Sequence, residues 1–597
     1  MNRVMCQIRS RAEKTVTTLA VVSCLISLPV RAETGAGKPA AVDTVNSAPK
    51  PETSAGMPAP SLFNFYVPPV NVTALDEEGG VSSSANPQAQ TPTAPATAPS
   101  LDMGFFHRLG RAYTADWAGN GPGTVTAEPR RGTPGPIPSP PYPATDWPIG
   151  ATPVIGAPDG QTYPLMQTIN ENKGVNKIYG WIEIGGNGST NNKSNAGKGI
   201  AANAPAAYDV YSNTIQLDQA ALYFEKIENT AQTKNFDWGY RLTMLYGTDY
   251  RFTTSHGLLS QQLLVKNSQY GFDPVMFYLD GYFPHVGKGM IVRIGRYISL
   301  PDIEAQLAPN NYTYSHSILY TYDCYTQLGV NATIKLSDHW TVQGGVSPGC
   351  DTMPWTTDAK VTGNACVVYT WHNGGDALNT CDNTINDGKY AYNNLTAFYE
   401  TWYHRISANW HTDTEAWYQY MKATPNMYWY NTGTPNTAST PWPETNGSGV
   451  NLNFGAVCQD PRAAASTQSS RCYAPDWAIT NYVEHNFWKN TASLNIRNEI
   501  VDDIKGQRTG TPAVYEEHMV GFDFWSGTTV TFRPELSFTK CYSKYKTLDG
   551  KDVSCTDISA GSSIASDTGE GIGNPYLPTG RGKTAVLTLA ADLIFHF

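Results

Sequence analysis

The sequence predicts an all-β fold: a transmembrane antiparallel up-and-down barrel of about 14 strands (12 to 16), preceded by a disordered Pro/Ala-rich N-terminal segment. Three observations predict it. Beyond its N-terminus, the chain has no stretch near the roughly 18 to 20 apolar residues that a membrane helix needs. From about Asn176 onward, segments of roughly 10 residues alternate apolar and polar positions. The connections between these segments alternate between short and long, as barrel turns and loops do.

The first 32 residues have the layout of a secretory signal peptide. Basic residues precede the mostly apolar run 16–28, and Val30-Arg31-Ala32 provides small residues at positions −3 and −1 of a cleavage site after Ala32. A lipoprotein cleavage box ending at Cys24 is the alternative, but it would leave an apolar stretch in the mature chain without evident purpose. We therefore expect export, with mature segments 33–164 and 165–597.

The mature chain is acidic. Residues 1–32 contain five of the 41 basic residues and one of the 51 acidic residues, which leaves 36 and 50 and a net charge of −14. Such a charge argues against nucleic acid as a partner, because nucleic-acid binding depends on basic surfaces.

The eight cysteines of the mature chain predict disulfides, because an even number in an exported chain favours oxidation. The spacing predicts three staples within single loops and leaves a fourth pair: Cys366 with Cys381, Cys458 with Cys472, Cys541 with Cys555, and Cys324 with Cys350. A metal site is the competing interpretation. It has little support, since no two cysteines stand at the C-x-x-C spacing of zinc sites.

The segment from Glu33 to about Pro164 is dominated by Ala, Pro, Thr, Ser and Gly. It cannot bury enough apolar surface to offset chain entropy, so we expect a mostly disordered periplasmic segment. One stretch inside it, Leu101 to Trp117, has the apolar spacing of a helix. It either packs as a short helix near the barrel mouth or contacts nothing.

The last segment of the chain shows the strand pattern best. Its apolar positions share one face, and its polar positions share the other: Ala585, Leu587, Leu589, Ala591, Leu593, Phe595 and Phe597 against Thr584, Thr588, Asp592 and His596. A soluble β-sandwich also alternates, but it rarely keeps ionic residues on one face and aromatic residues on the other. The aromatic C-terminus, Phe597, resembles the signal that outer-membrane insertion machinery reads.

Fourteen segments follow from this pattern: 176–187, 214–227, 236–250, 273–283, 288–299, 317–335, 338–347, 391–410, 415–423, 479–487, 491–501, 515–525, 528–540 and 583–597. Short turns are expected near 228, 285, 337, 412, 489 and 526, and mostly long loops between the other segments. An even strand number returns Phe597 to the side where the chain enters.

On this map, charged residues of both signs project into the barrel: Glu183, Asp218, Arg241, Asp280, Arg293, Arg497, Glu499, Asp523, Arg533, Glu535 and Asp592. Such residues can line a hydrated path that admits polar solutes. Alternatively, they form salt bridges that fill the interior.

A family resemblance is visible from Gly295-Arg296 onward. The run continues through Pro301, Glu304, Ala308-Pro309-Asn310-Asn311, Tyr314-Ser315, Gly329-Val330, Leu336-Ser337-Asp338, Trp340 and Gly344-Gly345. It resembles the putative β-barrel porin-2, OmpL-like, family, and the similarity extends from about Gly156 to Phe597. The resemblance implies an outer-membrane porin of undefined selectivity. Cys350-Asp351 departs from the pattern, where Trp-Asp is expected.

The third long connection, Leu300 to Ser315, contains Asp302 and Glu304. In many porins the third extracellular loop folds inward and narrows the channel, so these two residues are constriction candidates. An ordinary surface loop is the alternative.

Catalytic motifs are missing. The sequence has no H-E-x-x-H, P-loop or G-x-S-x-G motif, and the glycines of 569–573 follow no strand. Residues 382–388 lack the alternating ligands of a calcium loop. We therefore expect no enzyme, no cofactor and no metal.

The sequence thus predicts a porin of the bacterial outer membrane that passes small hydrophilic solutes by diffusion. Its expected partners are outer-membrane lipid and lipopolysaccharide, the barrel-assembly machinery and small polar solutes, and a homo-trimer is a possible assembly. A structural or ligand-binding surface barrel with disulfide-stapled loops is the alternative. A secreted soluble β-protein that binds carbohydrate is a third reading, given the many Trp and Tyr residues.

Overall fold

The computed structural model describes part of the chain: residues 104–118, 163–170, 175–194, 203–385 and 395–425 with short gaps, 456, 458, 469, 471–544 with short gaps, and 583–597. The signal peptide expected at 1–32 and most of the segment 33–164 lie outside the described residues.

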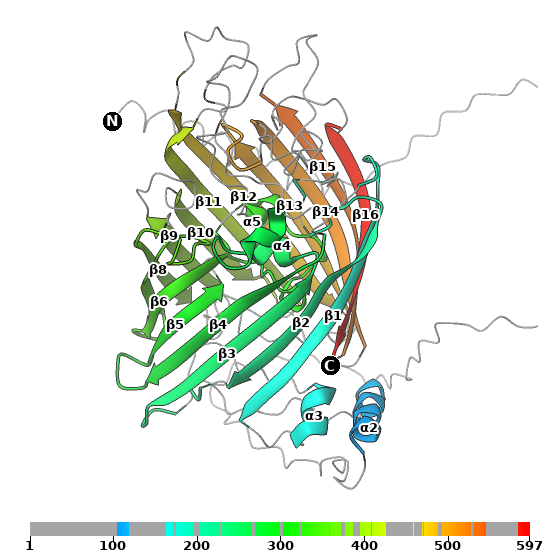
Figure 1. Cartoon of the computed structure of the whole chain (residues 1–597), viewed down its shortest axis with the longest axis vertical. Coiled ribbons are helices and arrows are strands. Elements are labelled where there is room, and N and C mark those ends of the chain that lie inside the picture. Colours follow the sequence, from blue (N-terminus) through cyan, green and yellow to red (C-terminus); the bar gives the residue numbers. More distant parts are fainter. Residues whose placement is uncertain are drawn as a thin grey trace, which may run out of the picture. The chain divides into compact units, whose positions relative to one another are not determined.

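Sixteen antiparallel strands form a closed barrel, in which each strand pairs with its neighbours in sequence and β1 pairs with β16 (Figure 1). The strands are β1 (Asn176–Ser189), β2 (Ile215–Lys226), β3 (Asp237–Gly247), β4 (Gly271–Phe283), β5 (Met290–Ile298), β6 (Thr326–Lys335), β7 (Trp340–Ser347), β8 (Thr362–Trp371), β9 (Asp376–Ile385), β10 (Leu395–Arg405), β11 (Trp410–Pro425), β12 (Arg471–Phe487), β13 (Ala492–Asp503), β14 (Ala513–Ser526), β15 (Val530–Ser543) and β16 (Ala585–His596). The all-β barrel prediction is confirmed, with a strand number at the upper end of the expected range.

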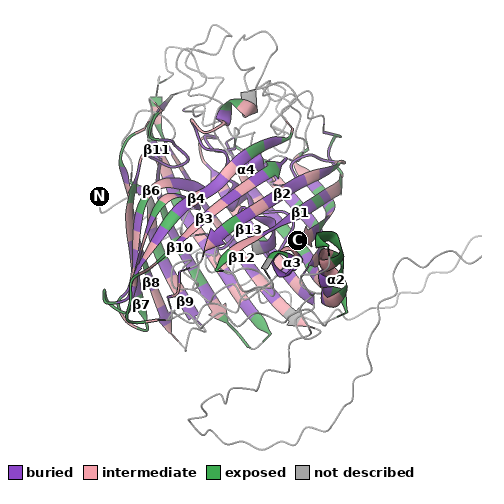
Figure 2. Cartoon of the chain, turned by 60° about the horizontal axis from the view of Figure 1, so that its bottom comes forward, coloured by how far each residue is buried: buried purple, intermediate pink, exposed green. Residues whose placement is uncertain are grey.

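The two faces of the wall differ as the alternation predicts. Along β16, Leu587, Leu589 and Leu593 are exposed on the outside, whereas Thr588 and Asp592 are buried on the inside. Figure 2 shows the same alternation of buried and exposed positions along other strands. A closed wall leaves no unpaired strand edge, and its exposed apolar face suits a lipid environment.

The fourteen-segment map is wrong in three places. The expected long loop 348–390 contains the hairpin of β8 and β9, and the expected strand 317–335 begins with a loop and a short helix, α5 (Ile318–Thr321). The turn expected near 412 lies at 406–409, so Thr412 belongs to β11.

Short helices lie in the connections or precede the barrel. Between β3 and β4 stand α4 (Tyr250–Thr253) and η3 (Ser260–Leu264), and between β5 and β6 stand η4 (Ala308–Asn310) and α5. No helix among the described residues is both long enough and apolar enough to span a membrane.

Two helices pack at the barrel end that carries the C-terminus (Figure 1): α2 (Phe105–Trp117) and α3 (Pro164–Asn170). The Tyr113 hydroxyl of α2 donates to the His596 carbonyl at 3.1 Å, and its ring stacks on Phe595. The Trp117 indole donates to Thr529 Oγ1 at 3.0 Å. The helix expected between Leu101 and Trp117 therefore exists and contacts the barrel mouth.

Candidate functional site

Loop L3, the connection between β5 and β6 (residues 299–325), crosses the barrel interior. Within it, the Ile303 amide donates to Glu415 of β11 at 2.8 Å, and the Ala308 amide donates to Gln219 of β2 at 3.1 Å. Strands β2 and β11 are far apart in the barrel order. One loop can bond to both only by passing through the interior, which excludes the surface-loop alternative for this segment.

Arg497 on β13 binds the middle of L3. Its guanidinium donates to the Ser315 carbonyl at 2.7 Å and to Ser315 Oγ at 2.8 Å, and it forms an ion pair with Glu517 of β14. Glu535 of β15 accepts from the Ser315 amide at 3.2 Å. Ser315 is thus held by charge-assisted hydrogen bonds from two sides, which are stronger than neutral ones.

Arg533 on β15 binds the preceding part of L3. Its Nη1 donates to the carbonyls of Ala308 at 2.8 Å and Asn311 at 3.0 Å. Its other nitrogens pair with Asp592 of β16, and Nη2 lies 3.3 Å from Glu183 of β1. The same arginine therefore ties L3 to the seam where the first and last strands meet.

Glu499 on β13 anchors the start of α5. Its two carboxylate oxygens accept from the amides of Ile318 at 2.8 Å and Leu319 at 3.0 Å. These amides have no partner within the helix, because the first turn of a helix leaves its N–H groups free. The carboxylate therefore satisfies donors that burial would otherwise leave unpaired.

The two constriction candidates, Asp302 and Glu304, are both buried within L3. Glu304 accepts from the Tyr482 hydroxyl of β12 at 2.6 Å and from the Ser317 amide at 3.0 Å. Burial raises the pKa of Glu304 above its ordinary value, although Arg497 opposes that rise. The inward position of both residues is observed, and their role in narrowing a passage stays a prediction.

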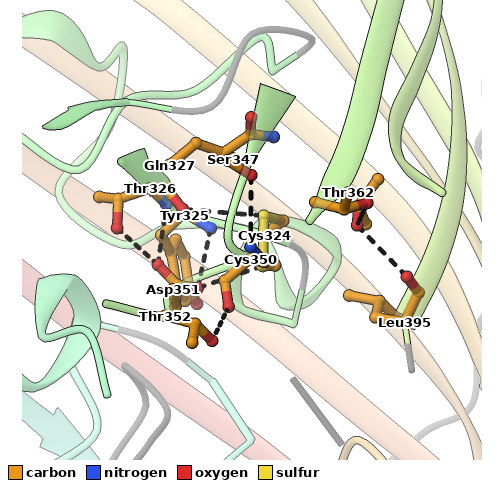
Figure 3. Close-up of a disulfide and its surroundings, with 12 residues drawn as sticks. Cys324, Tyr325, Thr326, Gln327, Ser347, Cys350, Asp351, Thr352, Thr362 and Leu395 are labelled. Atoms are coloured by element: carbon orange, nitrogen blue, oxygen red, sulfur yellow. Dashed lines mark hydrogen bonds between the residues drawn. A yellow bond between two sulfur atoms is a disulfide. The ribbon is translucent and has the colours of Figure 1, made fainter. Parts of the chain in front are cut away.

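The end of L3 is fixed by a disulfide, Cys324–Cys350 (Figure 3). Beside it, the Asp351 carboxylate accepts from the Thr326 amide at 2.8 Å, the Thr326 hydroxyl at 2.7 Å and the Tyr325 amide at 3.2 Å. Burial raises the pKa of Asp351 to about 6, against these hydrogen bonds. Cys350 and Asp351, where the chain departs from the family pattern, lie in the loop that follows β7. They bind the C-terminal end of L3 to that loop.

The ten residues predicted as pore-lining all lie on the inner side of the wall, and each is at most 8% exposed: Glu183, Asp218, Arg241, Asp280, Arg293, Arg497, Glu499, Arg533, Glu535 and Asp592. Five of them bond directly to L3: Asp218, Arg497, Glu499, Arg533 and Glu535. Arg293 forms a bidentate pair with Asp280, and Arg241 pairs with Glu225. In the structure these residues therefore form hydrogen bonds to L3 or ion pairs with other residues of the inner wall. Their contact with a water-filled passage stays a prediction.

Sequence reasoning missed Arg296, which is fully buried and pairs with Asp273 of β4 at 2.9 Å. Arg296 lies three residues after Arg293, so strict alternation places the two side chains on opposite faces. Gly295 stands between them with φ 138°, a conformation that favours glycine. Gly295 is the sequence signal that could have revealed that the inward and outward alternation shifts by one residue here.

Three of the four predicted disulfide pairings are present: Cys324–Cys350, Cys366–Cys381 and Cys458–Cys472. The expected placement within a single loop is wrong for Cys366–Cys381, because this disulfide joins opposite residues of the neighbouring strands β8 and β9 within the wall. Cys472 likewise belongs to β12. Cys541 is disulfide-bonded, and its expected partner Cys555 lies outside the described residues, so that pairing stays a prediction.

The sequence matches the model of one protein family, described as putative beta-barrel porin-2, OmpL-like, over residues 176–565. The chain belongs to this family. The match begins at the first residue of β1, includes L3 and ends after β15. It confirms the family resemblance that the run from Gly295 to Gly345 carries.

Three of the solved structures that are similar to this porin-2 chain share little sequence identity with it. The anion-selective porin from Comamonas acidovorans has 8% identity and a TM-score of 0.40, with 71% of this chain and 99% of that chain covered. The outer membrane channel DcaP of Acinetobacter baumannii has 10% identity and a TM-score of 0.38, with 71% and 97% covered. OmpT of Vibrio cholerae has 8% identity and a TM-score of 0.37, with 71% and 97% covered. Among curated proteins, none matches the sequence.

Proposed function

We propose that this porin-2 family member is a bacterial outer-membrane porin through which small hydrophilic solutes diffuse passively, with L3 as its constriction. The observation that carries the proposal is the placement of L3. The loop leaves β5 and is bound by Arg497, Arg533 and Glu499 on the opposite part of a polar inner wall. A rigidly held loop across a polar lumen sets the size of what can pass.

The outer surface supports a location in a membrane, and we propose that this is the outer membrane with its lipopolysaccharide leaflet. Exposed apolar residues such as Ile182, Leu279 and Leu589 face outward from the wall. Phe597 ends the strand that closes the barrel, and we propose that the barrel-assembly machinery reads it as the insertion signal.

Conductance in planar bilayers tests the proposal. Purified wild-type protein is expected to give stepwise openings. A variant with residues 302–317 replaced by a short Gly/Ser linker is expected to give larger steps, because the loop no longer narrows the lumen. Lys360→Met, at a loop position outside L3, is the control and should conduct as the wild type does. Folded wild-type and linker-variant barrels that both fail to conduct would overturn the proposal.

A second candidate function is a surface barrel with little conductance, and one observation favours it. The ten inner charged residues named above are at most 8% exposed, as expected of a filled interior. This function predicts that folded wild-type protein is silent in the bilayer whereas the linker variant conducts. The two functions therefore give opposite results for the wild type in one experiment.

We further propose that the protein forms a homo-oligomer, with a trimer as the expected assembly, through a polar outer face on β9 to β14. Glu400 and Thr380 share a hydrogen bond of 2.8 Å on this face, and both are exposed. On β11, Thr412 and Thr414 lie between the outward aromatics Trp410 and Tyr418, and both accept from Asn481. Polar side chains between two aromatic girdles are costly against lipid, so a protein partner is the better cover.

The two flanks of this face are complementary. One carries the Glu400 carboxylate, and the other carries His518, which is hydrogen-bonded to Asn498 at 2.8 Å. Unlike flanks meet head to tail, and such contacts close into a ring when the rotation allows it. A second copy of this chain therefore fits the face by polarity.

Size-exclusion chromatography with light scattering in detergent tests the interface. The double variant Thr380→Leu, Glu400→Leu is expected to shift the oligomer toward monomer, because it removes polar contacts between copies. Leu589→Ala, on the outward face of β16, should leave the assembly unchanged. A wild-type protein that is monomeric in mild detergent and cannot be cross-linked in membranes would contradict the proposal.

A further inference from the structure

Two carboxylates and a histidine converge on the inner wall, close to the barrel end that carries the C-terminus. His411 and Asp413 are successive inward residues of β11, and Glu484 lies opposite His411 on β12. One ligand atom from each of the three residues lies within 4.8 Å of the others. Each residue is only 1–2% exposed. The backbone register of two paired strands therefore builds this triad.

Four polar atoms of the triad lack a hydrogen-bond partner among the described residues. Neither oxygen of Glu484 accepts a hydrogen bond, and Asp413 Oδ1 and His411 Nδ1 are likewise without a partner among the described residues. His411 Nε2 lies 3.1 Å from Glu484 Oε2 without the alignment of a hydrogen bond. Unpaired acceptors in a buried site are costly, because burial removes the water that would otherwise donate to them.

Within the described part of the chain, the carboxylates of the triad have no cation bonded to them, and the nearby Arg405 of β10, which lies opposite His411, is exposed. No Lys or Arg of the described chain forms an ion pair with Asp413 or Glu484. The contrast with the opposite part of the wall is direct, because Arg241 and Arg293 each pair there with a carboxylate. The carboxylates of the triad are thus arranged so that they can ligate a metal ion.

We propose that His411, Asp413 and Glu484 bind a divalent transition-metal ion of the Zn²⁺ or Mn²⁺ type. An imidazole nitrogen beside two carboxylate oxygens is a donor set for these ions, whereas Ca²⁺ and Mg²⁺ prefer oxygen alone. The Tyr312 hydroxyl of L3 stands 3.3 Å from His411 Nε2 and 3.4 Å from Asp413 Oδ2. Metal bound by the triad therefore sits against the constriction loop, on the side of the C-terminal end.

This inference does not rest on diffusion through the barrel. Metal binding needs only the folded wall, and it is measured in detergent without any conductance. Failure of the porin proposal in bilayers would leave the metal site intact. Conversely, a conducting barrel that retains no metal would refute the site alone.

Equilibrium dialysis with metal analysis tests the site on the full mature chain in detergent, after EDTA treatment and addition of Zn²⁺ or Mn²⁺ alone. We expect one ion per chain for the wild type. His411→Gln and Glu484→Gln should each weaken binding by at least about tenfold, because each removes a ligand. His404→Gln is the matched control, since His404 pairs with Asp376 at 2.6 Å on β9 and β10, and this pair belongs to no three-residue ligand cluster in the described part of the chain. Its metal binding should equal that of the wild type.

Thermal unfolding gives a second readout that does not depend on stoichiometry. Without metal, Glu484→Gln should be at least as stable as the wild type, because it removes an unpaired buried charge. Zn²⁺ should raise the Tm of the wild type and leave that of Glu484→Gln unchanged. If a glutamine variant fails to fold, Asp413→Asn replaces it in both measurements. A wild-type protein that retains neither ion, or that binds no better than the glutamine variants, would overturn the proposal.

Discussion

Phe597 and Gly180 close the barrel wall by exchanging backbone hydrogen bonds: the Gly180 amide donates to the Phe597 carbonyl at 3.2 Å, and the Phe597 amide donates to the Gly180 carbonyl at 2.9 Å. The Phe597 ring also covers the glycine. An added Cβ at Gly180 would lie 2.7 Å from Phe597 Cζ and 2.1 Å from the Ala221 carbonyl oxygen. The aromatic C-terminus is therefore part of the seam, and it packs over a glycine as aromatic residues in designed sheets do.

Gly180→Val should impair closure of the barrel. The added side chain meets backbone on one side and the Phe597 ring on the other, and overpacking of this kind costs about 1–3 kcal/mol. Gly188→Val is the matched control on the same strand, because nothing lies within 4 Å of its Cβ position. Migration of unheated samples on gels measures the closed fraction. Equal closed fractions for the two variants would contradict this packing at the seam.

Arg497→Met should release L3 from the wall. The change leaves the buried Glu517 without its cation and removes two hydrogen bonds to Ser315. Breaking a buried pair from one side costs about 3–5 kcal/mol. Limited proteolysis should then cleave within 302–325.

Lys288→Met provides the comparison for that variant. Its ion pair with Asp338 is exposed, with side-chain exposures of 46% and 74%, so its loss should cost at most about 1 kcal/mol. L3 should stay protected from protease in this variant. Protection of L3 in Arg497→Met as well would show that the arginine does not hold the loop.

Reduction of individual disulfides should separate loop anchoring from wall stability. Replacing Cys324 and Cys350 by serine frees the exit of L3 and should cost about 2–4 kcal/mol. Replacing Cys366 and Cys381 removes a link between strands that are already paired in register, so L3 should stay ordered. Hydrogen exchange of the L3 amides measures the difference. Equal exchange in both double variants would argue against the Cys324–Cys350 anchor.

Much of the wall was predictable because one physical rule, apolar outside and polar inside, acts on every residue of a membrane strand. The rule fails where the outer face is itself polar. On β9, the outward positions include Thr380 and Asp382, and on β11 they include Thr412 and Thr414. With both faces polar the alternation vanishes on β9 and β11, which explains the turn expected near 412. On β8 the inward Cys366 and Val368 are as apolar as the outward Val367, so the alternation is lost there too and the hairpin is missed.

The interior was predictable only in part. Alternation identified inward charges such as Arg497, but it says nothing about the partner across the barrel. The bond from Arg497 to Ser315 joins residues 182 positions apart. The triad was missed for a related reason: the expected turn near 412 removed His411 and Asp413 from any strand, and so from the inner face.

His316 should make the docking of L3 sensitive to acid. The ring is fully buried, its Nε2–H donates to the Ala305 carbonyl at 2.7 Å, and it stacks on Tyr208. Burial lowers the pKa of His316 well below the ordinary value of 6.5, and the charges of Arg497 and Arg533 act in the same direction. The docked ring is therefore neutral. As the pH falls below 6.5, His316 becomes protonated in the undocked loop but stays neutral in the docked loop. Docking of L3 therefore weakens progressively.

Other groups of L3 titrate with the opposite sign, so the histidine must be isolated by substitution. Burial raises the pKa of Glu304, and its contribution favours the docked loop as the pH falls. His316→Gln keeps a neutral donor near Ala305 and cannot take up the proton. Proteolysis of L3 should accelerate several-fold between neutral pH and about pH 5 in the wild type, and much less in His316→Gln. Equal proteolysis rates for the wild type and His316→Gln at neutral pH would confirm that the variant docks L3 normally. Identical pH profiles for the two proteins would exclude His316 as the origin of the acid sensitivity.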